Sequence, residues 1–404
     1  MLILRRCTAI MAALAAVLLG VAWPSRADQV RDDQQPFLNT LDIEQAWHAT
    51  RGSGVTVAVL DSGVDASQPD LVGQVTTGPD YAKGANPPGV APKRFHGTMM
   101  ASIIAGHGHG PGGSAGIIGI APEARLLSVR VILDNDEPGF NFYNSNEKYA
   151  DATAKGIRYA ADHGAEIINM SLGKPLPSKD EREAIAYAIS KGVVVIASAG
   201  NQGDSTKEFS RYSYPASYPG VISVAAVDLN HKHAGFSNKN SAVVVSAPGV
   251  RVPAEGPDGN YWFVGGTSPA AAFVSGTAAL IRSKYPHLAP ALVAQAIVSS
   301  TSTHPSGGYD AGLGFGEIDA TGALQAAGKL SGAKMSGIGL PADRRFVVGQ
   351  LPAVQVVEHD RSLLAVYSAI ATVGLFGLLA SLMGFIAWRR KRPTPVLAYP
   401  TYDR

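Results

Sequence analysis

Three short motifs contain the residue types that acyl-transfer chemistry requires. Asp61 follows the β-branched run 55–60, His96 stands before an apolar segment of small residues, and Ser268 follows a pair of glycines. A serine hydroxyl is a weak nucleophile until a neighbouring imidazole takes its proton. The imidazole in turn needs a carboxylate that fixes its tautomer and stabilises its charged form. Asp61, His96 and Ser268 are therefore candidates for one catalytic site.

Each motif on its own also has a structural interpretation. Residues 61–63 are typical of a turn, and residues 96–98 and 266–268 are typical of helix starts. We expect Ser268 to be the N-cap of a helix that runs through Ile281, because Pro269 suits the first helical position. The joint occurrence of the motifs, in the order Asp, His, Ser, favours the catalytic interpretation over three separate structural ones.

The elements that must position these residues alternate between strands and helices. Strands are expected at 55–60, 125–133, 166–170, 193–197, 221–227 and 243–247, and helices at 99–105, 149–163, 178–191, 268–281 and 290–300. Before them, residues 28–54 are expected to be a polar lead-in with one short packed helix. This alternation predicts an α/β fold with a central, mostly parallel sheet and helices on both faces. Strand-end loops of such a sheet are where α/β enzymes place their chemistry.

The sequence from about residue 38 to residue 327 resembles the subtilisin-like serine proteases, or subtilases. The resemblance is carried by residues 57–65, 96–98 and 266–268, which match the three signatures of that family. It implies a subtilisin-like fold and serine endopeptidase activity on peptide or protein substrates.

The resemblance also implies a role for each candidate. Asp61 would orient the imidazole, His96 would be the general base and then the general acid, and Ser268 would be the nucleophile. Since the base must be neutral, activity is expected to fall as the pH drops through the pKa of His96, near 6.5 if nothing shifts it. The α/β-hydrolase alternative requires the pattern G-x-S-x-G, and here Ala270 occupies the last position.

A fourth element supports activity. Residues 198–203 resemble the family loop whose asparagine donates to the oxyanion, which assigns that role to Asn201, together with the N–H of Ser268. A turn is the structural alternative for this segment. Asn169 competes as a donor, but it lies inside a strand pattern, so we expect it to be structural.

The substrate strand is expected beside Ser171, Leu172 and Gly173, which resemble the family segment that pairs with an extended peptide. Adding the substrate as a strand satisfies its backbone groups whatever its sequence. The insertion 134–148 contains aromatic residues that could shape substrate access, although a solvated loop is the default expectation.

Both ends of the chain predict export and membrane attachment. Residues 1–27 are typical of a secretory signal peptide, with Arg5 and Arg6 before an apolar run. Residues 330–361 are expected to be a juxtamembrane tether, 362–388 a transmembrane helix and 389–404 a basic cytoplasmic tail. The domain at 28–329 would then be the extracytoplasmic peptidase of a single-pass protein of the cell membrane.

The flanks of the motifs resemble the mycosins, the membrane-anchored subtilases of type VII secretion systems. The match rests on residues 100–108 and 266–270, together with the signal peptide and the C-terminal span. It implies association with a type VII secretion membrane complex. The alternative is a mainly structural subunit of such a complex, with dispensable proteolysis. Only 33 residues separate Ala27 from Asp61, so no domain-sized prodomain is expected, as in the mycosin pattern.

Composition excludes several classes. The 404 residues carry a net charge of +2 with 16% charged residues, which does not predict nucleic-acid binding. The one cysteine, Cys7, lies in the predicted signal peptide, so cysteine catalysis and disulfides are not expected in the mature chain. Mycosins usually carry disulfides, and the chain departs from them in this respect.

No cofactor and no metal site are predicted. Asp70 matches a calcium ligand of many subtilases, but residues 110–119 offer only Ser114 to complete that site. His107 and His109 are too few ligands for a closed zinc site, and we expect a solvated glycine loop there.

Overall fold

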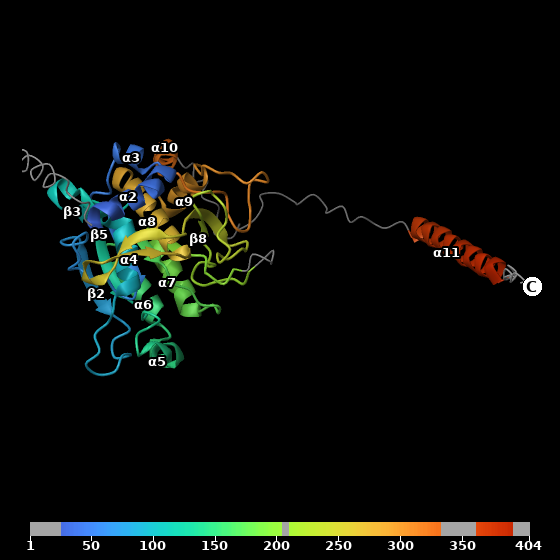
Figure 1. The fold of residues 1–404 in the computed structure, drawn as a ribbon, viewed down its shortest axis with the longest axis horizontal. Helices are drawn as coiled ribbons and strands as arrows, with labels where there is room; N and C mark the ends of the chain where they lie inside the picture. Colours follow the sequence, from blue (N-terminus) through green and yellow to red (C-terminus); the bar gives the residue numbers. More distant parts are fainter. Residues whose placement is uncertain (1–25, 204–209, 333–360, 391–404) are drawn as a thin grey trace, which may run out of the picture. The chain divides into compact units, whose positions relative to one another are not determined.

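The computed structural model describes residues 26–203, 210–332 and 361–390. It contains two compact units, Met1–Lys334 and Met335–Arg404, drawn as a ribbon in Figure 1. Nearly all of the predicted signal peptide and tether, and most of the basic tail, lie outside the described residues.

A seven-stranded sheet forms the centre of the first unit, in the order β2-β5-β1-β6-β7-β8-β9. All of its neighbouring strands run parallel. The strands are β1 (Thr56–Asp61), β2 (Val75–Asp80), β5 (Arg125–Arg130), β6 (Ile167–Met170), β7 (Val194–Ser198), β8 (Ile222–Val227) and β9 (Val243–Pro248). The predicted parallel α/β sheet is confirmed.

Strand β1 shows why this sequence forms a sheet that is buried on both sides. Val57 and Val59 belong to one apolar core, while Ala58 and Leu60 belong to the other. Because successive side chains of a strand point to opposite faces, a strand covered on both faces needs an uninterrupted apolar run.

Helices supply both covers. One core contains residues of α2 (Arg26–Thr40), α3 (Ile43–Trp47), α4 (Phe95–Ala105), α8 (Thr267–Lys284), α9 (Pro290–Val298) and α10 (Ala320–Ser331). The other contains residues of α6 (Ala152–Asp162) and α7 (Lys179–Ser190). In Figure 1, α2, α3, α9 and α10 gather at one end of the unit. Helix α8 is buried from Thr267 through Arg282, so the segment that carries Ser268 is an interior element.

Several elements were not expected from the sequence. They are β2, α10, the pair β3 (His107–His109) and β4 (Ala115–Ile118), and the pair β10 (Val252–Glu255) and β11 (Tyr261–Val264). The expectation of only a short helix in the lead-in was wrong, since α2 spans 15 residues. Two of its polar side chains point into the domain: Arg31 Nε donates to Gly116 O at 2.8 Å, and Gln34 Nε2 to Ile118 O at 2.6 Å. The usual apolar stripe is therefore weak in the sequence.

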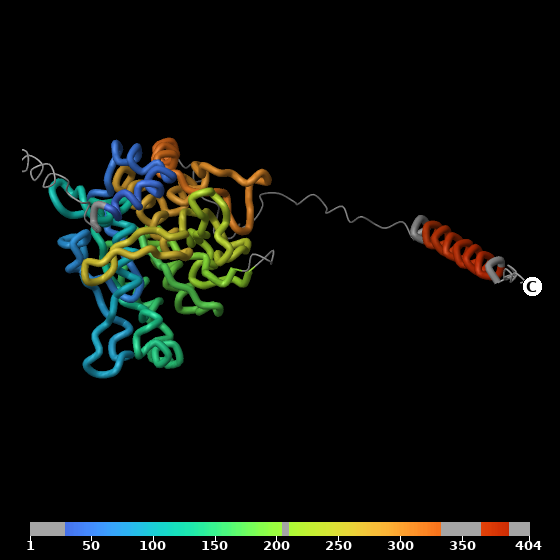
Figure 2. The backbone as a smooth tube through the Cα atoms, viewed as in Figure 1, coloured from blue at the N-terminus to red at the C-terminus, as the bar shows by residue number. Residues whose placement is uncertain are grey.

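The insertion 134–148 contains a short helix, α5 (Phe140–Ser145), followed by the 3₁₀ turn η2 (Glu147–Tyr149). Figure 2 shows this segment beside the loop 81–93 at the opposite end of the unit from α3 and α10. The two segments share a small apolar core that contains Ala82, Ala85 and Tyr143. The insertion is thus packed against the rest of the unit.

The second unit contains the helix α11 (Arg361–Arg390), which has 30 residues. Within it, the 23-residue stretch Ala365–Ala387, in which an 18-residue window has a mean hydropathy of 2.1, is long and apolar enough to cross a membrane. This agrees in length and composition with the predicted span.

Candidate active site

Asp61 and His96 meet where the end of β1 faces the start of α4. The ring nitrogen His96 Nδ1 lies 2.8 Å from Asp61 Oδ1, and the Asp61 side chain is fully buried. The same carboxylate oxygen accepts the N–H of Ser62 at 2.7 Å, which fixes its orientation. A proton on Nδ1 donates to Asp61, so Nε2 is left free to accept a proton in the neutral ring.

The carboxylate also sets the charge preference of the ring. Burial opposes the charged imidazolium, but the negative charge and hydrogen bond of Asp61 outweigh it and raise the pKa of His96 above its usual value. The value of 6.5 applied only if nothing shifted the pKa of His96, and in the structure that condition is not met.

The glycine of the His-Gly-Thr motif allows this close approach. A Cβ atom at Gly97 would lie 2.2 Å from the carbonyl oxygen of Gly63 and 3.2 Å from Asp61 Cβ. Helix α4 could not sit so near the end of β1 with any larger residue there.

Ser268 lies in the first turn of α8 and lines the same cleft as His96. Its Oγ donates to Ser171 O at 3.3 Å, and among the described residues no hydrogen bond joins it to the His96 ring. The nucleophile–base bond of an acyl-transfer site is often looser before substrate binds. In this structure the Asp–His pair is therefore formed, while the Ser268 hydroxyl points to the carbonyl oxygen of Ser171.

The expectation that Ser268 is the N-cap was wrong. The cap position belongs to Gly266, and α8 begins at Thr267. The helix begins earlier because the N–H and the hydroxyl of Thr267 both donate to Asn201 Oδ1, each at 2.9 Å. An external oxygen thus replaces the serine cap that the sequence predicts.

The same contacts orient Asn201, which follows β7. Because its carboxamide oxygen accepts two bonds from Thr267, its amide nitrogen remains as a donor in the cleft that Asn201 lines. Asn169 is buried, donates to Ser171 Oγ at 3.1 Å and accepts from Ser275 at 2.9 Å. These bonds give Asn169 a structural role.

The cleft has a volume of about 570 Å³. Six of the seven predicted site residues line it: His96, Ser171, Leu172, Gly173, Asn201 and Ser268. The seventh, Asp61, is buried behind His96. The insertion forms another part of its wall through Asn135, Phe140 and residues 143–147. The expectation that the insertion is a solvated loop was wrong here, because part of it lines the cleft. Its aromatic residues were the sequence feature that pointed to this.

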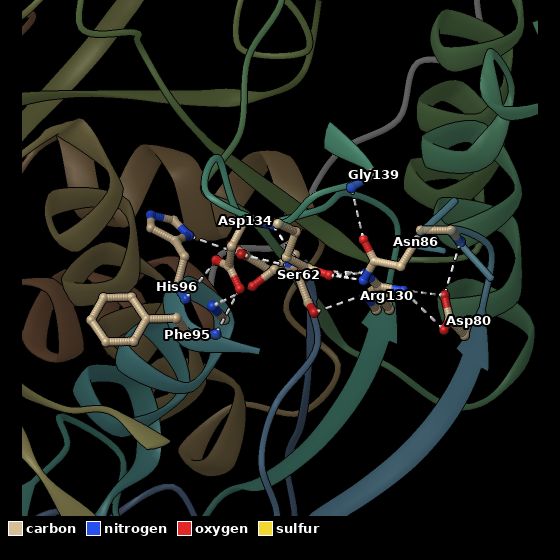
Figure 3. A network of polar contacts seen from close by, with 12 residues as sticks. Ser62, Asp80, Asn86, Phe95, His96, Arg130, Asp134 and Gly139 are labelled. Atoms are coloured by element: carbon tan, nitrogen blue, oxygen red, sulfur yellow. Dashed lines mark hydrogen bonds and ion pairs between the residues drawn. The ribbon is translucent and has the colours of Figure 1, made fainter. Parts of the chain in front are cut away.

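Sequence reasoning missed Asp134, a buried carboxylate on the other side of His96. Its two oxygens accept the backbone N–H groups of Phe95 at 2.8 Å and His96 at 3.0 Å, as Figure 3 shows. Burial raises the pKa of Asp134, and these two N–H groups oppose that shift. No pattern in the sequence connects residue 134 with residue 96, because the contact exists only after the chain has folded.

The residues weighed for metal binding form a hydrogen-bonded cluster. Asp70 Oδ1 lies 2.6 Å from His109 Nδ1, and Asp70 Oδ2 accepts the N–H of Ile117 at 2.7 Å and the hydroxyl of Tyr261 at 3.1 Å. The expectation of a solvated glycine loop was wrong, since His107–His109 is strand β3. Protein donors satisfy the Asp70 carboxylate, and the described residues contain no group of three or more His, Cys, Asp or Glu placed to hold a metal ion.

Comparison with known proteins decides the family. The sequence profile of the subtilase family matches residues 52–316. The chain belongs to the subtilase family. It is therefore a serine-type endopeptidase with the subtilisin fold, as its sequence predicted.

The chain is also similar to individual proteins of this family. It is 39% identical to thermitase from Thermoactinomyces vulgaris over 60% of this chain and 80% of thermitase. It is 34% identical to fervidolysin from Fervidobacterium pennivorans over 70% of this chain, a match that spans 42% of fervidolysin. Among solved structures, MycP1 from the ESX-1 type VII secretion system superposes with a TM-score of 0.61 at 29% identity, covering 76% of this chain and 87% of MycP1.

The mycosin-like character predicted from the sequence is thereby confirmed. A further MycP1 structure is described as having its N-terminal propeptide removed, so that protein has a propeptide. The absence of a domain-sized prodomain from this chain stays a prediction.

Proposed function

We propose that this subtilase is a membrane-anchored endopeptidase that hydrolyses peptide bonds outside the cytoplasmic membrane. In this proposal Ser268 is the nucleophile, His96 the general base and then the general acid, and Asp61 the residue that orients the ring. The observation that carries it is the 2.8 Å contact between His96 and the buried Asp61, in the wall of a cleft that Ser268 also lines.

The geometry supports a two-step acyl transfer. His96 Nε2 takes the proton of Ser268 Oγ as the oxygen attacks the scissile carbonyl, and Asp61 stabilises the imidazolium that forms. The Nδ2 group of Asn201 and the N–H of Ser268 would bind the oxyanion. One such donor lowers the barrier by about 3–4 kcal/mol, a magnitude measured on subtilisin itself. His96 then protonates the leaving amine, and water repeats the sequence on the acyl-enzyme.

Substrate binding is assigned to Ser171, Leu172 and Gly173. These residues line the cleft, and strand addition of an extended peptide beside them would bring its carbonyl to Ser268. In the structure Ser171 O accepts the Ser268 hydroxyl at 3.3 Å, so a bound peptide has to compete for that contact. No cofactor is invoked in this reaction.

Covalent labelling tests the nucleophile. A fluorophosphonate probe is expected to label the wild-type enzyme and the Ser283→Ala variant, but not Ser268→Ala. Ser283 lies on the same helix outside the cleft and is a matched control. Labelling that survives in Ser268→Ala would remove Ser268 as the nucleophile.

Membrane attachment is proposed from α11 and the residues around it. The apolar stretch Ala365–Ala387 is followed by Arg389, Arg390, Lys391 and Arg392, which belong on the cytoplasmic side. With a signal peptide at 1–27, a tether at 330–361 and a tail at 389–404, this puts the peptidase domain, 28–329, outside the membrane.

The similarity to MycP1 supports a link to type VII secretion. The alternative role, a structural subunit of the secretion complex, is favoured by the same similarity and by the anchoring helix. Complementing a deletion strain with Ser268→Ala separates the two. Restored secretion favours the structural role, and lost secretion favours the protease.

A further inference from the structure

The start of helix α4 is held by a side chain from a distant part of the chain. The N-cap residue, Arg94, has a left-handed backbone with φ of 56° and makes no side-chain cap bond. Asp134 instead accepts the N–H groups of Phe95 and His96, at 2.8 Å and 3.0 Å. These are among the N–H groups that a helix leaves without internal partners, and a carboxylate is favourable at the positive end of a helix.

A buried ion-pair network fixes Asp134 in this position. Its own N–H donates to Glu137 Oε1 at 3.1 Å, and Glu137 Oε2 pairs with Arg130 Nη2 at 3.0 Å. Arg130 also binds Asp80 at 3.1 Å. Figure 3 shows this chain of contacts extending from His96 to the edge strand β2.

The network also reaches the loop that follows Asp61. Arg130 Nε donates to Ser62 O at 3.2 Å, and Ser62 Oγ accepts the N–H of Gly97 at 3.1 Å. The two segments that present Asp61 and His96 are therefore tied to each other through Ser62, Arg130 and Asp134.

We propose that Asp134 is a positioning residue of the catalytic site: it holds the first turn of α4 so that His96 meets Asp61, and it places a second negative charge beside the imidazolium that forms during catalysis. It is not a catalytic residue, since its carboxylate contacts backbone N–H groups and no reacting atom. This inference rests on the proposed role of His96 as the general base.

The effect of Asp134 on the His96 ring depends on the other charged groups near that ring. Asp61 contacts the ring from β1, and the charges of both Asp61 and Asp134 raise the pKa of His96. The other charged residues that line the cleft are Glu147, Lys174 and Glu181, and Arg94 precedes His96 on its own segment. Lys174 and Glu181 form an ion pair at 2.7 Å, so their charges largely cancel at the ring.

The pH dependence of kcat/KM of the full-length enzyme on a chromogenic peptide tests the proposal. Asp134→Asn keeps an oxygen acceptor but removes the charge, so the acid limb is expected to move to lower pH by about half a unit. We also expect kcat/KM on the plateau to fall roughly 3–30-fold, because the imidazole is held less well. Asp134→Ser, which keeps a capping oxygen of a different kind, is expected to move the acid limb in the same direction even if Asp134→Asn folds poorly.

Asp136→Asn is the matched control. It removes the same charge from the same loop, but Asp136 is exposed and pairs with Lys93 at 2.6 Å, so its acid limb is expected to move less. An unchanged acid limb in both Asp134 variants, or an equal shift in Asp136→Asn, overturns the role of Asp134. If the wild type has no acid limb, the proposed role of His96 fails instead.

Discussion

The imidazole of His96 is half-buried in the wall of the cleft, yet it is more easily charged than a free histidine because its pKa is raised. Burial disfavours its protonated form, and the contact with Asp61 at 2.8 Å more than compensates. At the scale of this residue, the carboxylate proposed to assist catalysis also makes the proposed base easier to inactivate by acid.

The pH profile follows with a definite sign. His96, as the proposed base, works only when neutral, and its pKa is raised. The value of kcat/KM is therefore expected to reach half of its plateau at a pH above 6.5 and to keep falling at lower pH. Initial rates between pH 5 and pH 9, at substrate concentrations well below KM, measure this limb. A midpoint below 6.5 would contradict the raised value.

Glu255 is a second residue whose burial has a consequence for pH. Its Oε1 accepts the N–H of Asp70 at 3.2 Å, and no described residue forms a hydrogen bond with its buried Oε2. Burial, together with the charge of Asp70, raises the pKa of Glu255 to about 8. The carboxyl therefore carries a proton at neutral pH in the folded enzyme but not in the unfolded chain.

Folding stability is expected to decrease as the pH rises from the unfolded value of Glu255 through 8, because the unfolded state binds fewer protons there. Each unit of pKa difference contributes about 1.4 kcal/mol. Urea unfolding at pH 5 and pH 9, in a Ser268→Ala background that prevents autolysis, measures the effect. Glu255→Gln is expected to lose less stability between these conditions than its parent. The exposed Glu123→Gln is the control, and equal losses in all three proteins would contradict the prediction.

Among the elements, α8 does more than carry Ser268. The hydroxyl of Thr267, in its first turn, accepts the N–H of Gly200 at 3.1 Å and donates to Asn201 Oδ1 at 2.9 Å. The start of this helix and the loop after β7 thus form one hydrogen-bonded corner, and the corner determines which end of the Asn201 amide faces the cleft.

Thr267→Val is expected to lower kcat about 10-fold with little change in KM, since it removes the bond that orients the proposed oxyanion donor and leaves the residues proposed to bind the peptide in place. Thr277→Val is the control, because that hydroxyl is also buried in α8 but bonds only to Phe273 O. Steady-state kinetics of both variants distinguish the outcomes. An equal loss in the control would indicate damage to the helix itself.

The sequence predicted the central elements well because their signals are local. The apolar run of β1 and the motifs at residues 96–98 and 266–268 each describe a short stretch of chain. The features it did not predict depend on contacts between distant residues. The cap on α4 comes from Asp134, and the start of α8 is set by Asn201. The Ser268 hydroxyl bonds to the carbonyl oxygen of Ser171, which lies 97 positions earlier in the sequence.

At the scale of the whole chain, the two units differ in where their apolar residues lie. The first unit has an apolar interior closed by helices on both sheet faces. In the second, the residues of α11 from Ala365 to Ala387 are apolar and exposed along the helix. An exposed apolar surface of that length is stable in a lipid bilayer and unfavourable in water.

Topology can be tested with single cysteines, because Cys7 is the one native cysteine. In a Cys7→Ser background, a membrane-impermeant maleimide applied to intact cells is expected to label Lys179→Cys, whose side chain is exposed on α7. It should not label Thr394→Cys in the proposed cytoplasmic tail until the cells are opened. The reverse pattern would invert the proposed orientation.

Helix α2 has a consequence for the order of events during export. Arg31 and Gln34 bond to carbonyl oxygens of residues 113–118, which lie 82–85 positions later in the sequence. In the proposed export, the first part of the domain to cross the membrane lacks these partners until β4 has followed it. A protease that attacked the emerging chain in that interval would find this helix without the contacts that hold it in the folded domain.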